Sequence, residues 1–286
     1  MELSLSKEQN KGSGMSEISQ NFMKLVDHSK VASGLFAIHL DHPGEKVNKL
    51  SPTVMVEFNA LLDSLKTRKD VKALVIISEK ESIFVAGADI EVIREINDPK
   101  DGEKLARDGQ AVLQKLEEMP FPVIAAIHGA AMGGGTELAL CCKYIVVSDS
   151  PATRIALPEV NLGILPGFGG TVRMPKRIGL QASLDYILSG KAMNGDKAVK
   201  LGFADACLPF QNFKTRALEW AAPIAAGKKP LSHQKPLSFM AKAQVALLEH
   251  TPAGRALIFS QAKKMVLAKT RGHYPAPLKI LEVLAK

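Results

Sequence analysis

The sequence has no run of eighteen apolar residues, so it contains no stretch typical of a membrane-spanning helix. Aromatic residues make up only 5% of the 286 residues, and the basic residues are scattered along the chain. Both features argue against a nucleic-acid-binding surface, which combines stacking aromatics with clustered positive charge. The net charge of +8 is moderate for this length and fits an ordinary solvated surface.

Cysteine is also scarce. The three cysteines are Cys141, Cys142 and Cys207, an odd number that cannot all pair, and no Cys/His spacing matches a zinc site. We interpret them as small core residues in a reducing compartment, and we expect a cytoplasmic protein with no bound metal. Residues 1–15 are polar and lack the apolar segment of a secretory signal. Residues 1–20 are expected to form a flexible N-terminal segment.

Predicted strands and helices alternate through the first two thirds of the chain. Leu35 to Leu40 and Val71 to Ser78 have the β-branched, apolar character of strands. Between them, Ser51 followed by Pro52 predicts the start of a helix. After the second strand, Asp101 to Met119 predicts an amphipathic helix. Such alternation indicates an α/β protein with right-handed crossovers around parallel sheet. Periodicity alone does not distinguish a spiral of such units from a doubly wound sheet.

The pattern beyond Pro209 is helical, with prolines between the segments. Four helices are predicted, at Asn212 to Ala222, Phe239 to Leu248, Ala253 to Ala268 and Leu278 to Ala285. No Gly-x-Gly-x-x-Gly motif follows a predicted strand, so a nicotinamide-binding domain is not expected.

The stretch from Phe121 to Pro175 has the residues best suited to chemistry. An apolar strand, Val123 to Ile127, leads to three glycines, Gly133 to Gly135, at the start of a helix. Glycines there let a ligand approach bare N–H groups at the positive end of the helix dipole, which suits an oxygen that becomes negatively charged. Two acidic residues, Glu137 and Glu159, accompany this site. By position alone, Glu137 could simply complement the helix dipole, and Glu159 could be a solvated turn residue.

An ordered set of motifs resembles the enoyl-CoA hydratase/isomerase (crotonase) superfamily. The set comprises Gly133 to Glu137, Leu157 to Glu159 and Pro166 to Arg173. Together with Gly44 to Asn48, these motifs look closest to the hydratase domain of multifunctional fatty-acid-oxidation enzymes. A lone glycine triplet would be weak evidence, whereas the ordered set is specific.

The resemblance implies a crotonase-like ββα superhelix, a spiral, with a C-terminal helical subdomain. The spiral core is expected at residues 21–209, and the helical subdomain, covering the active site, at residues 210–286. The terminal helices of the multifunctional relatives fold over their own domain, so the tail should cover apolar surface. The side chains expected to do so are Leu257, Ile258, Met265 and Val266.

The activity implied by the resemblance is that of a 2-enoyl-CoA hydratase of fatty-acid β-oxidation, which adds water syn across the C2=C3 bond of an enoyl-CoA thioester. Glu137 would activate the water, and Glu159 would exchange the proton at C2. The N–H groups of Ala88 and Gly134 would form the oxyanion hole. Two alternatives stay open: a Δ3-Δ2-enoyl-CoA isomerase, also as a second activity, and a non-catalytic acyl-CoA-binding protein.

The resemblance also assigns substrate contacts. Lys46, Ala86, Asp89 and Ile90 are expected to bind coenzyme A, which belongs to the substrate, so no separate cofactor is expected. Without the resemblance, Asp89 could equally be a helix N-cap after a tight turn, and Lys46 a solvated lysine. The expected partners are an acyl-CoA or enoyl-CoA substrate and either further copies, as a trimer, or other β-oxidation enzymes.

Overall fold

The computed structural model describes residues 21–233 and 238–286, and the expectation of a flexible segment at residues 1–20 lies outside this part. A six-stranded sheet occupies the centre, with strands in the order β1-β2-β3-β5-β7-β9. These strands are β1 (Met23–Asp27), β2 (Leu35–Leu40), β3 (Ala73–Ser78), β5 (Val123–Ile127), β7 (Tyr144–Ser148) and β9 (Ala206–Leu208). Only β1 is antiparallel to its neighbour within this sheet; the others pair in parallel.

A second, three-stranded parallel sheet has the order β4-β6-β8. Its strands are β4 (Ile83–Val85), β6 (Ala130–Met132) and β8 (Arg154–Ala156). The chain alternates between the sheets, because β3 leads to β4, β5 to β6 and β7 to β8, with helical segments after each pair. This repeated ββα unit is the expected spiral rather than a doubly wound sheet.

Local signals account for the helices that follow these strands. Ser51 caps α1 (Pro52–Lys66), its hydroxyl accepting a 3.4 Å hydrogen bond from the N–H of Val54, and Pro52 occupies the first helical turn as predicted. The other core helical segments are α2 (Ile90–Arg94), α3 (Pro99–Glu117), α4 (Gly134–Leu140), the 3₁₀ helix η1 (Pro158–Leu162), α5 (Gly170–Ile178), α6 (Leu180–Ser189) and α7 (Gly195–Leu201).

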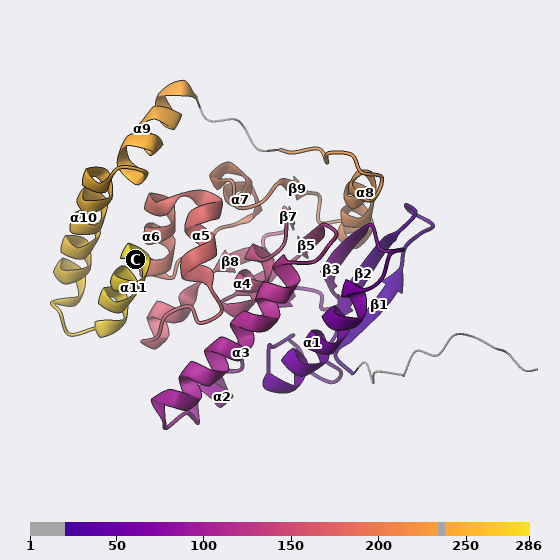
Figure 1. Ribbon diagram of the computed structural model, residues 1–286, viewed down its shortest axis with the longest axis horizontal. Helices are drawn as coiled ribbons and strands as arrows, with labels where there is room; N and C mark the ends of the chain where they lie inside the picture. Colours follow the sequence, from indigo (N-terminus) through magenta and orange to yellow (C-terminus); the bar gives the residue numbers. More distant parts are fainter. Residues whose placement is uncertain (1–20, 234–237) are drawn as a thin grey trace, which may run out of the picture.

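The helices after residue 210 lie in two places (Figure 1). Helix α8 (Phe213–Ala225) packs on the six-stranded sheet, where Ala217 and Trp220 join the apolar side chains of its strands. Helices α9 (Phe239–Glu249), α10 (Pro252–Thr270) and α11 (Pro275–Ala285) lie at the opposite end, beside α5 and α6. The predicted domain boundaries at residues 20 and 209 stay a prediction.

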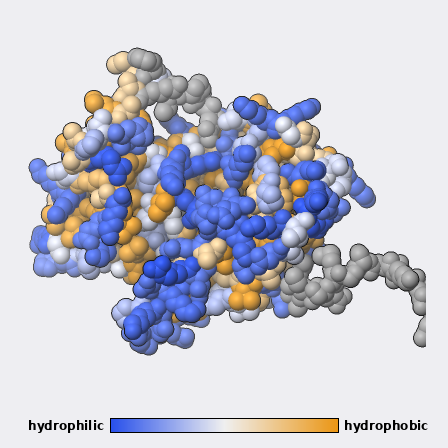
Figure 2. All heavy atoms as spheres, in the orientation of Figure 1, coloured by the Kyte–Doolittle hydropathy of each residue, from blue (hydrophilic) through white to orange (hydrophobic). Residues whose placement is uncertain are grey.

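Only one side of α10 covers the core. Ile258, Ala262 and Val266, spaced by four residues, are buried as a helical stripe. Leu257 is 50% exposed and Met265 is 66% exposed, so the expectation that they cover apolar surface is wrong. Each precedes a buried residue by one position, which turns it about 100° around the helix. In Figure 2 apolar residues accordingly appear among charged ones on this part of the surface.

No helix within residues 21–233 and 238–286 has the length and apolar character needed to cross a membrane.

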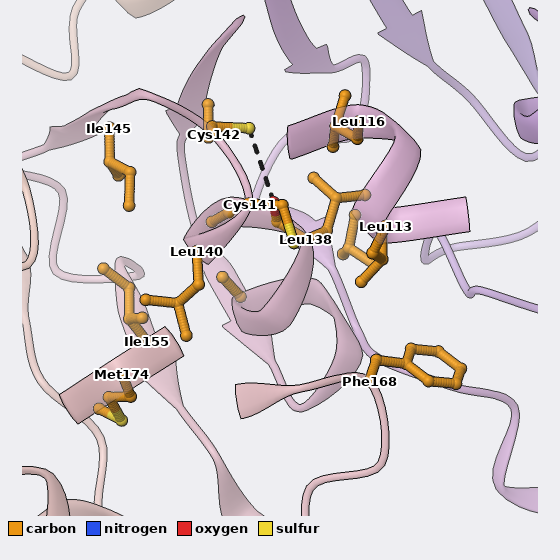
Figure 3. Close-up of a cluster of buried hydrophobic side chains, with 14 of the residues drawn as sticks. Leu113, Leu116, Leu138, Leu140, Cys141, Cys142, Ile145, Ile155, Phe168 and Met174 are labelled. Atoms are coloured by element: carbon orange, nitrogen blue, oxygen red, sulfur yellow. Dashed lines mark hydrogen bonds between the residues drawn. The ribbon is translucent and has the colours of Figure 1, made fainter. Parts of the chain in front are cut away.

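Cys141 and Cys142 are buried and unpaired, as expected of small core residues. The Sγ atom of Cys142 donates to the carbonyl oxygen of Leu138, one turn earlier in the chain (Figure 3). Cys207 is partly buried and also unpaired.

Candidate active site

Helix α4 is packed on several sides, which fixes the position of its first turn. Figure 3 shows Leu138 directed toward Leu113 and Leu116 of α3, and Leu140 toward Ile155 of β8. These side chains belong to the main apolar core. Every residue of this seven-residue helix is buried. The groups at its N-terminal end are therefore held by a rigid support.

The glycines before and within α4 allow close approaches that a side chain would prevent. Gly133 has φ 51° and ψ −120°, a conformation that disfavours other residues. A Cβ atom on Gly135 would lie 2.4 Å from the carbonyl oxygen of Val85, so glycine lets β4 pack directly on the helix. This packing brings the loop after β4 to the N-terminal end of α4.

Two backbone N–H groups come together there, from Ala88 and Gly134. A Cβ atom on Gly134 would lie 3.4 Å from the nitrogen of Ala88, and one on Gly87 would lie 3.6 Å from the nitrogen of Gly134. As the first residue of α4, Gly134 has an N–H with no acceptor inside the helix. The N–H of Ala88 likewise has no acceptor within the part of the chain that the structure describes. The two donors predicted from the sequence thus lie side by side.

Asn48 holds the loop that contributes Ala88, a role that sequence reasoning missed. Its backbone oxygen accepts from the N–H of Ala86 at 2.8 Å. Its buried side-chain amide donates to Ser78 Oγ at 2.9 Å and to the carbonyl oxygen of Phe84 at 3.1 Å. The loop before α1 is thereby tied to β3 and β4. No local pattern around Asn48 could have predicted partners more than 25 residues away.

Glu137 lies in the first turn of α4, and its side chain is only 2% exposed. Its Oε1 atom accepts hydrogen bonds from the N–H groups of Phe168, at 2.8 Å, and Gly170, at 2.7 Å. Burial raises the pKa of this carboxyl to about 7, while the two donors and the positive charge of Arg173 oppose the rise. Glu137 therefore has partners that favour its charged form.

Glu159, in η1, has a different environment. It is 8% exposed, and among the described residues its buried Oε2 atom has no hydrogen-bond partner. Its Oε1 atom lies 2.8 Å from the position of a Cβ atom on Gly133. Burial raises the pKa of Glu159 to about 8, and the negative charge of Glu137 adds to the rise. Burial and the neighbouring charge of Glu137 thus both favour the protonated form of Glu159.

Arg173, in α5, organises the loop that contacts Glu137. It donates to the carbonyl oxygen of Phe168 at 3.0 Å, and to Glu117 at 2.8 Å and Gln114 at 3.0 Å on α3. Sequence reasoning quoted Arg173 only as part of a motif. Its basic character gave no indication that it fixes a backbone donor of the site.

The residues expected to bind coenzyme A lie on the loop of Ala88 and on the neighbouring loop before α1. Lys46 is exposed, and the N–H of Ala86 is already bonded to Asn48. Asp89 is the N-cap of α2, accepting from the N–H of Glu91 at 3.2 Å, which is the alternative that the sequence left open. Ile90 is 46% exposed at the start of that helix.

The described ranges contain no group of three or more His, Cys, Asp or Glu side chains that could hold a metal ion. The site combines two backbone donors with two buried carboxyls that differ in their hydrogen-bond partners. Such a set can stabilise an oxyanion while it moves protons.

The spiral of ββα units with helices at its C-terminal end is the crotonase-like α/β fold. An enoyl-CoA hydratase of Geobacillus kaustophilus matches the structure with a TM-score of 0.68 and 26% identity, over 87% of this chain and 89% of that one. One from Bacillus anthracis has a TM-score of 0.66 and 25% identity, over 87% and 92%.

Sequence comparison gives the particular family. A family model described as enoyl-CoA hydratase/isomerase matches residues 30–273, and the chain belongs to this family. It is 43% identical over 259 residues to the fatty acid oxidation complex subunit alpha of Shewanella amazonensis, and 44% over 245 residues to that of Vibrio vulnificus. These alignments cover 91% and 86% of this chain but 36% and 34% of the relatives. The chain thus spans about a third of their length.

Proposed function

We propose that this chain is a 2-enoyl-CoA hydratase, which adds water syn across the C2=C3 bond of an enoyl-CoA thioester. The observation that carries the proposal is the pairing of two buried carboxyls in unlike environments, beside two converging N–H groups. Glu137 accepts two hydrogen bonds, whereas Oε2 of Glu159 has no partner among the described residues. Hydration needs one carboxyl as a base and one as an acid, and this asymmetry supplies both.

The thioester oxygen would be held by the N–H groups of Ala88 and Gly134. As water adds at C3, negative charge moves to this oxygen, and both donors strengthen their bonds to it. Loss of one such donor typically costs about 3–4 kcal/mol of transition-state stabilisation. The positive end of α4 adds to the stabilisation.

Glu137 would act as the base. Both of its hydrogen bonds fall on Oε1, so Oε2 is left to accept a proton from the attacking water. A pKa of about 7 suits a base that works near neutral pH. The pair of backbone donors keeps the carboxylate oriented while the proton moves.

Glu159 would act as the acid. Its pKa of about 8 keeps it protonated near neutral pH, and the proton passes to C2 as the enolate collapses. After one turnover the water's proton is on Glu137 and Glu159 is ionised. Exchange with solvent returns both groups to their starting states, so the reaction is balanced with no further reactant.

Δ3-Δ2 isomerisation is a second candidate activity. It moves one proton between C2 and C4, so it needs one carboxyl that both gives and takes a proton. The raised pKa of Glu159 and its unpartnered oxygen favour that role. We therefore propose isomerisation as a secondary activity of the same site.

The test is direct. Hydration removes the conjugated chromophore of an enoyl thioester, so the purified protein should lower the ultraviolet absorbance of a trans-2-enoyl-CoA. Absorbance that stays constant would reject the hydratase proposal. Tight acyl-CoA binding without turnover would instead favour the non-catalytic alternative.

The setting of the activity is also a proposal. Relatives named as fatty acid oxidation complex subunit alpha support a role in β-oxidation, in association with other enzymes of that process. We propose the cytoplasm as its location. Coenzyme A would enter as part of the substrate, with no separate cofactor. The exposed Lys46 and Ile90 remain candidate contacts for it, with Asp89 and the backbone of Ala86 beside them.

A further inference from the structure

One hydrogen bond joins the C-terminal helices to the segment that bears Glu159. The hydroxyl of Tyr274 donates to the backbone carbonyl oxygen of Val160, a residue 114 positions earlier in the chain. Tyr274 is the N-cap residue of α11, and Val160 directly follows Glu159 in η1. The contact therefore lies one residue from a carboxyl of the candidate active site.

The position of the Glu159 carboxyl depends on the backbone that carries it. Its Oε2 atom lacks a hydrogen-bond partner among the described residues, so side-chain bonds do not hold that oxygen in place. The carrier is a 3₁₀ helix of five residues, a form with poorer hydrogen-bond geometry than an α-helix. Anything that holds η1 thus also holds the acid.

Two backbone hydrogen bonds close the C-terminal end of η1. The N–H of Gly163 donates to the carbonyl oxygen of Val160 at 3.2 Å, and that of Ile164 donates to the carbonyl oxygen of Glu159 at 3.2 Å. Over the described ranges, Tyr274 provides the one side-chain hydrogen bond from another element to the η1 backbone. The Tyr274 hydroxyl and the N–H of Gly163 donate to the same oxygen of Val160, so Tyr274 holds this carbonyl from outside η1.

The helix behind Tyr274 is itself firmly docked. Ile280, Leu281 and Leu284 of α11 are buried in the main core. In α9, Glu249 accepts hydrogen bonds from the N–H of Leu180, at 2.7 Å, and of Gln181, at 3.1 Å, at the start of α6. Helix α6 packs against η1 in turn. The C-terminal helices thus reach η1 directly through Tyr274 and indirectly through α6.

We propose that Tyr274 is a positioning residue for Glu159, through which the docked C-terminal helices hold the acid of the active site in place. The proposal rests on the function proposed above. Without the Tyr274 hydroxyl, η1 gains freedom and water reaches the carboxyl more easily. The Glu159 side chain then spends less time in productive geometry, and the burial that keeps it protonated weakens.

The test compares Tyr274→Phe with Tyr144→Phe. The first keeps the ring and removes the hydroxyl; the second makes the same chemical change in β7, where the ring packs on Trp220. We expect kcat of Tyr274→Phe to fall about tenfold with little change in KM, because small displacements of a reacting group are costly. The alkaline limb of the pH–rate profile should move to lower pH, because a less buried Glu159 loses its proton earlier. Tyr144→Phe should match the wild type in kcat and in its pH–rate profile.

A second measurement does not depend on turnover. In protein with ¹³C-labelled glutamate, the Glu159 carboxyl signal is identified by its loss in Glu159→Gln, and its titration is followed by NMR. We expect its pKa to be lower in Tyr274→Phe than in the wild type. A folded Tyr274→Phe protein with an unchanged titration and rate profile would overturn the proposal. An inactive wild type would reject the hydratase function alone, since the titration still decides the role of Tyr274.

Discussion

Gly133 and Glu159 lie so close together that a side chain on the first would displace the carboxyl of the second. A Cβ atom on Gly133 would lie 2.8 Å from Oε1 of Glu159, so the carboxyl would have to move to make room for it. The glycine that begins the oxyanion segment therefore also makes room for the second carboxyl. The backbone at Gly133 thus contributes both to the oxyanion hole and to the space for the proposed acid, Glu159.

Gly133→Ala should therefore displace the Glu159 carboxyl, and we expect hydratase kcat to fall by at least about 10²-fold. Gly227→Ala is the matched control. Gly227 also has a positive φ, of 74°, but a Cβ atom there would meet nothing within 4 Å. Gly227→Ala should lose about 1–2 kcal/mol of stability from its positive φ. Gly133→Ala, with ψ of −120°, should lose about 1–3 kcal/mol, and denaturant unfolding measures both losses. Equal activity in the two variants would contradict the steric relationship.

The two glutamates should be separable by activity. Glu→Gln keeps the shape and removes the acid–base group, so Glu137→Gln and Glu159→Gln should each lower hydratase kcat by at least about 10²-fold, with little change in substrate affinity. Glu159→Gln should also abolish isomerisation, whereas Glu137→Gln should spare much of it. Both reactions are measured on both variants. Intact hydration in Glu137→Gln, or either reaction near the wild-type rate in Glu159→Gln, would show that the roles are wrongly assigned.

The pH dependence of kcat/KM should be bell-shaped. Activity needs Glu137 ionised, so it rises as pH increases through about 7; it needs Glu159 protonated, so it falls as pH increases through about 8. Because the carboxyls interact, these limbs belong to the pair rather than to either residue alone. The measurement is the hydration rate at low substrate concentration over a pH series. A flat profile from about pH 5 to about pH 10 would argue against both carboxyls as proton carriers.

Alanine substitutions at two adjacent residues of α10 should differ sharply in their effect on the free energy of unfolding. Ile258→Ala removes a side chain that is 7% exposed in the core, so we expect a loss of about 2–4 kcal/mol in the free energy of unfolding. Leu257→Ala removes one that is 50% exposed, and the loss should stay below about 1 kcal/mol. Denaturant unfolding of both variants measures the difference. Similar losses would mean that α10 does not pack as described.

Much of the local structure was predictable from the sequence. The strands at residues 35–40 and 123–127 and the capped start of α1 agree with their predicted bounds. Apolar runs and capping residues act on their immediate neighbourhood, so their effects can be deduced from adjacent residues. Strand β4 was missed because three residues leading into a loop of small residues carry too little periodicity.

The glycine triplet before Glu137 likewise predicted exposed N–H groups at a helix start. By contrast, the sequence left Asp89 open between a ligand contact and a helix cap, and the hydrogen bond to Glu91 shows the capping role. The sequence also could not predict which face of α10 is buried, because apolar residues lie on all sides of this helix. Packing against α6 and α11 decides which of them are buried.

The sequence by itself determined which chemical groups are available: bare N–H donors after Gly133, two glutamates, and the strands and helices that carry them. Only the tertiary structure brought Glu137 and Glu159 together, tied Asn48 to Phe84 beside the loop of Ala88, and joined Arg173 to Phe168 and Tyr274 to Val160. The reason is physical. Backbone conformation follows from neighbouring residues, whereas the proton affinity of a carboxyl depends on its burial and on charges that approach it from distant parts of the chain.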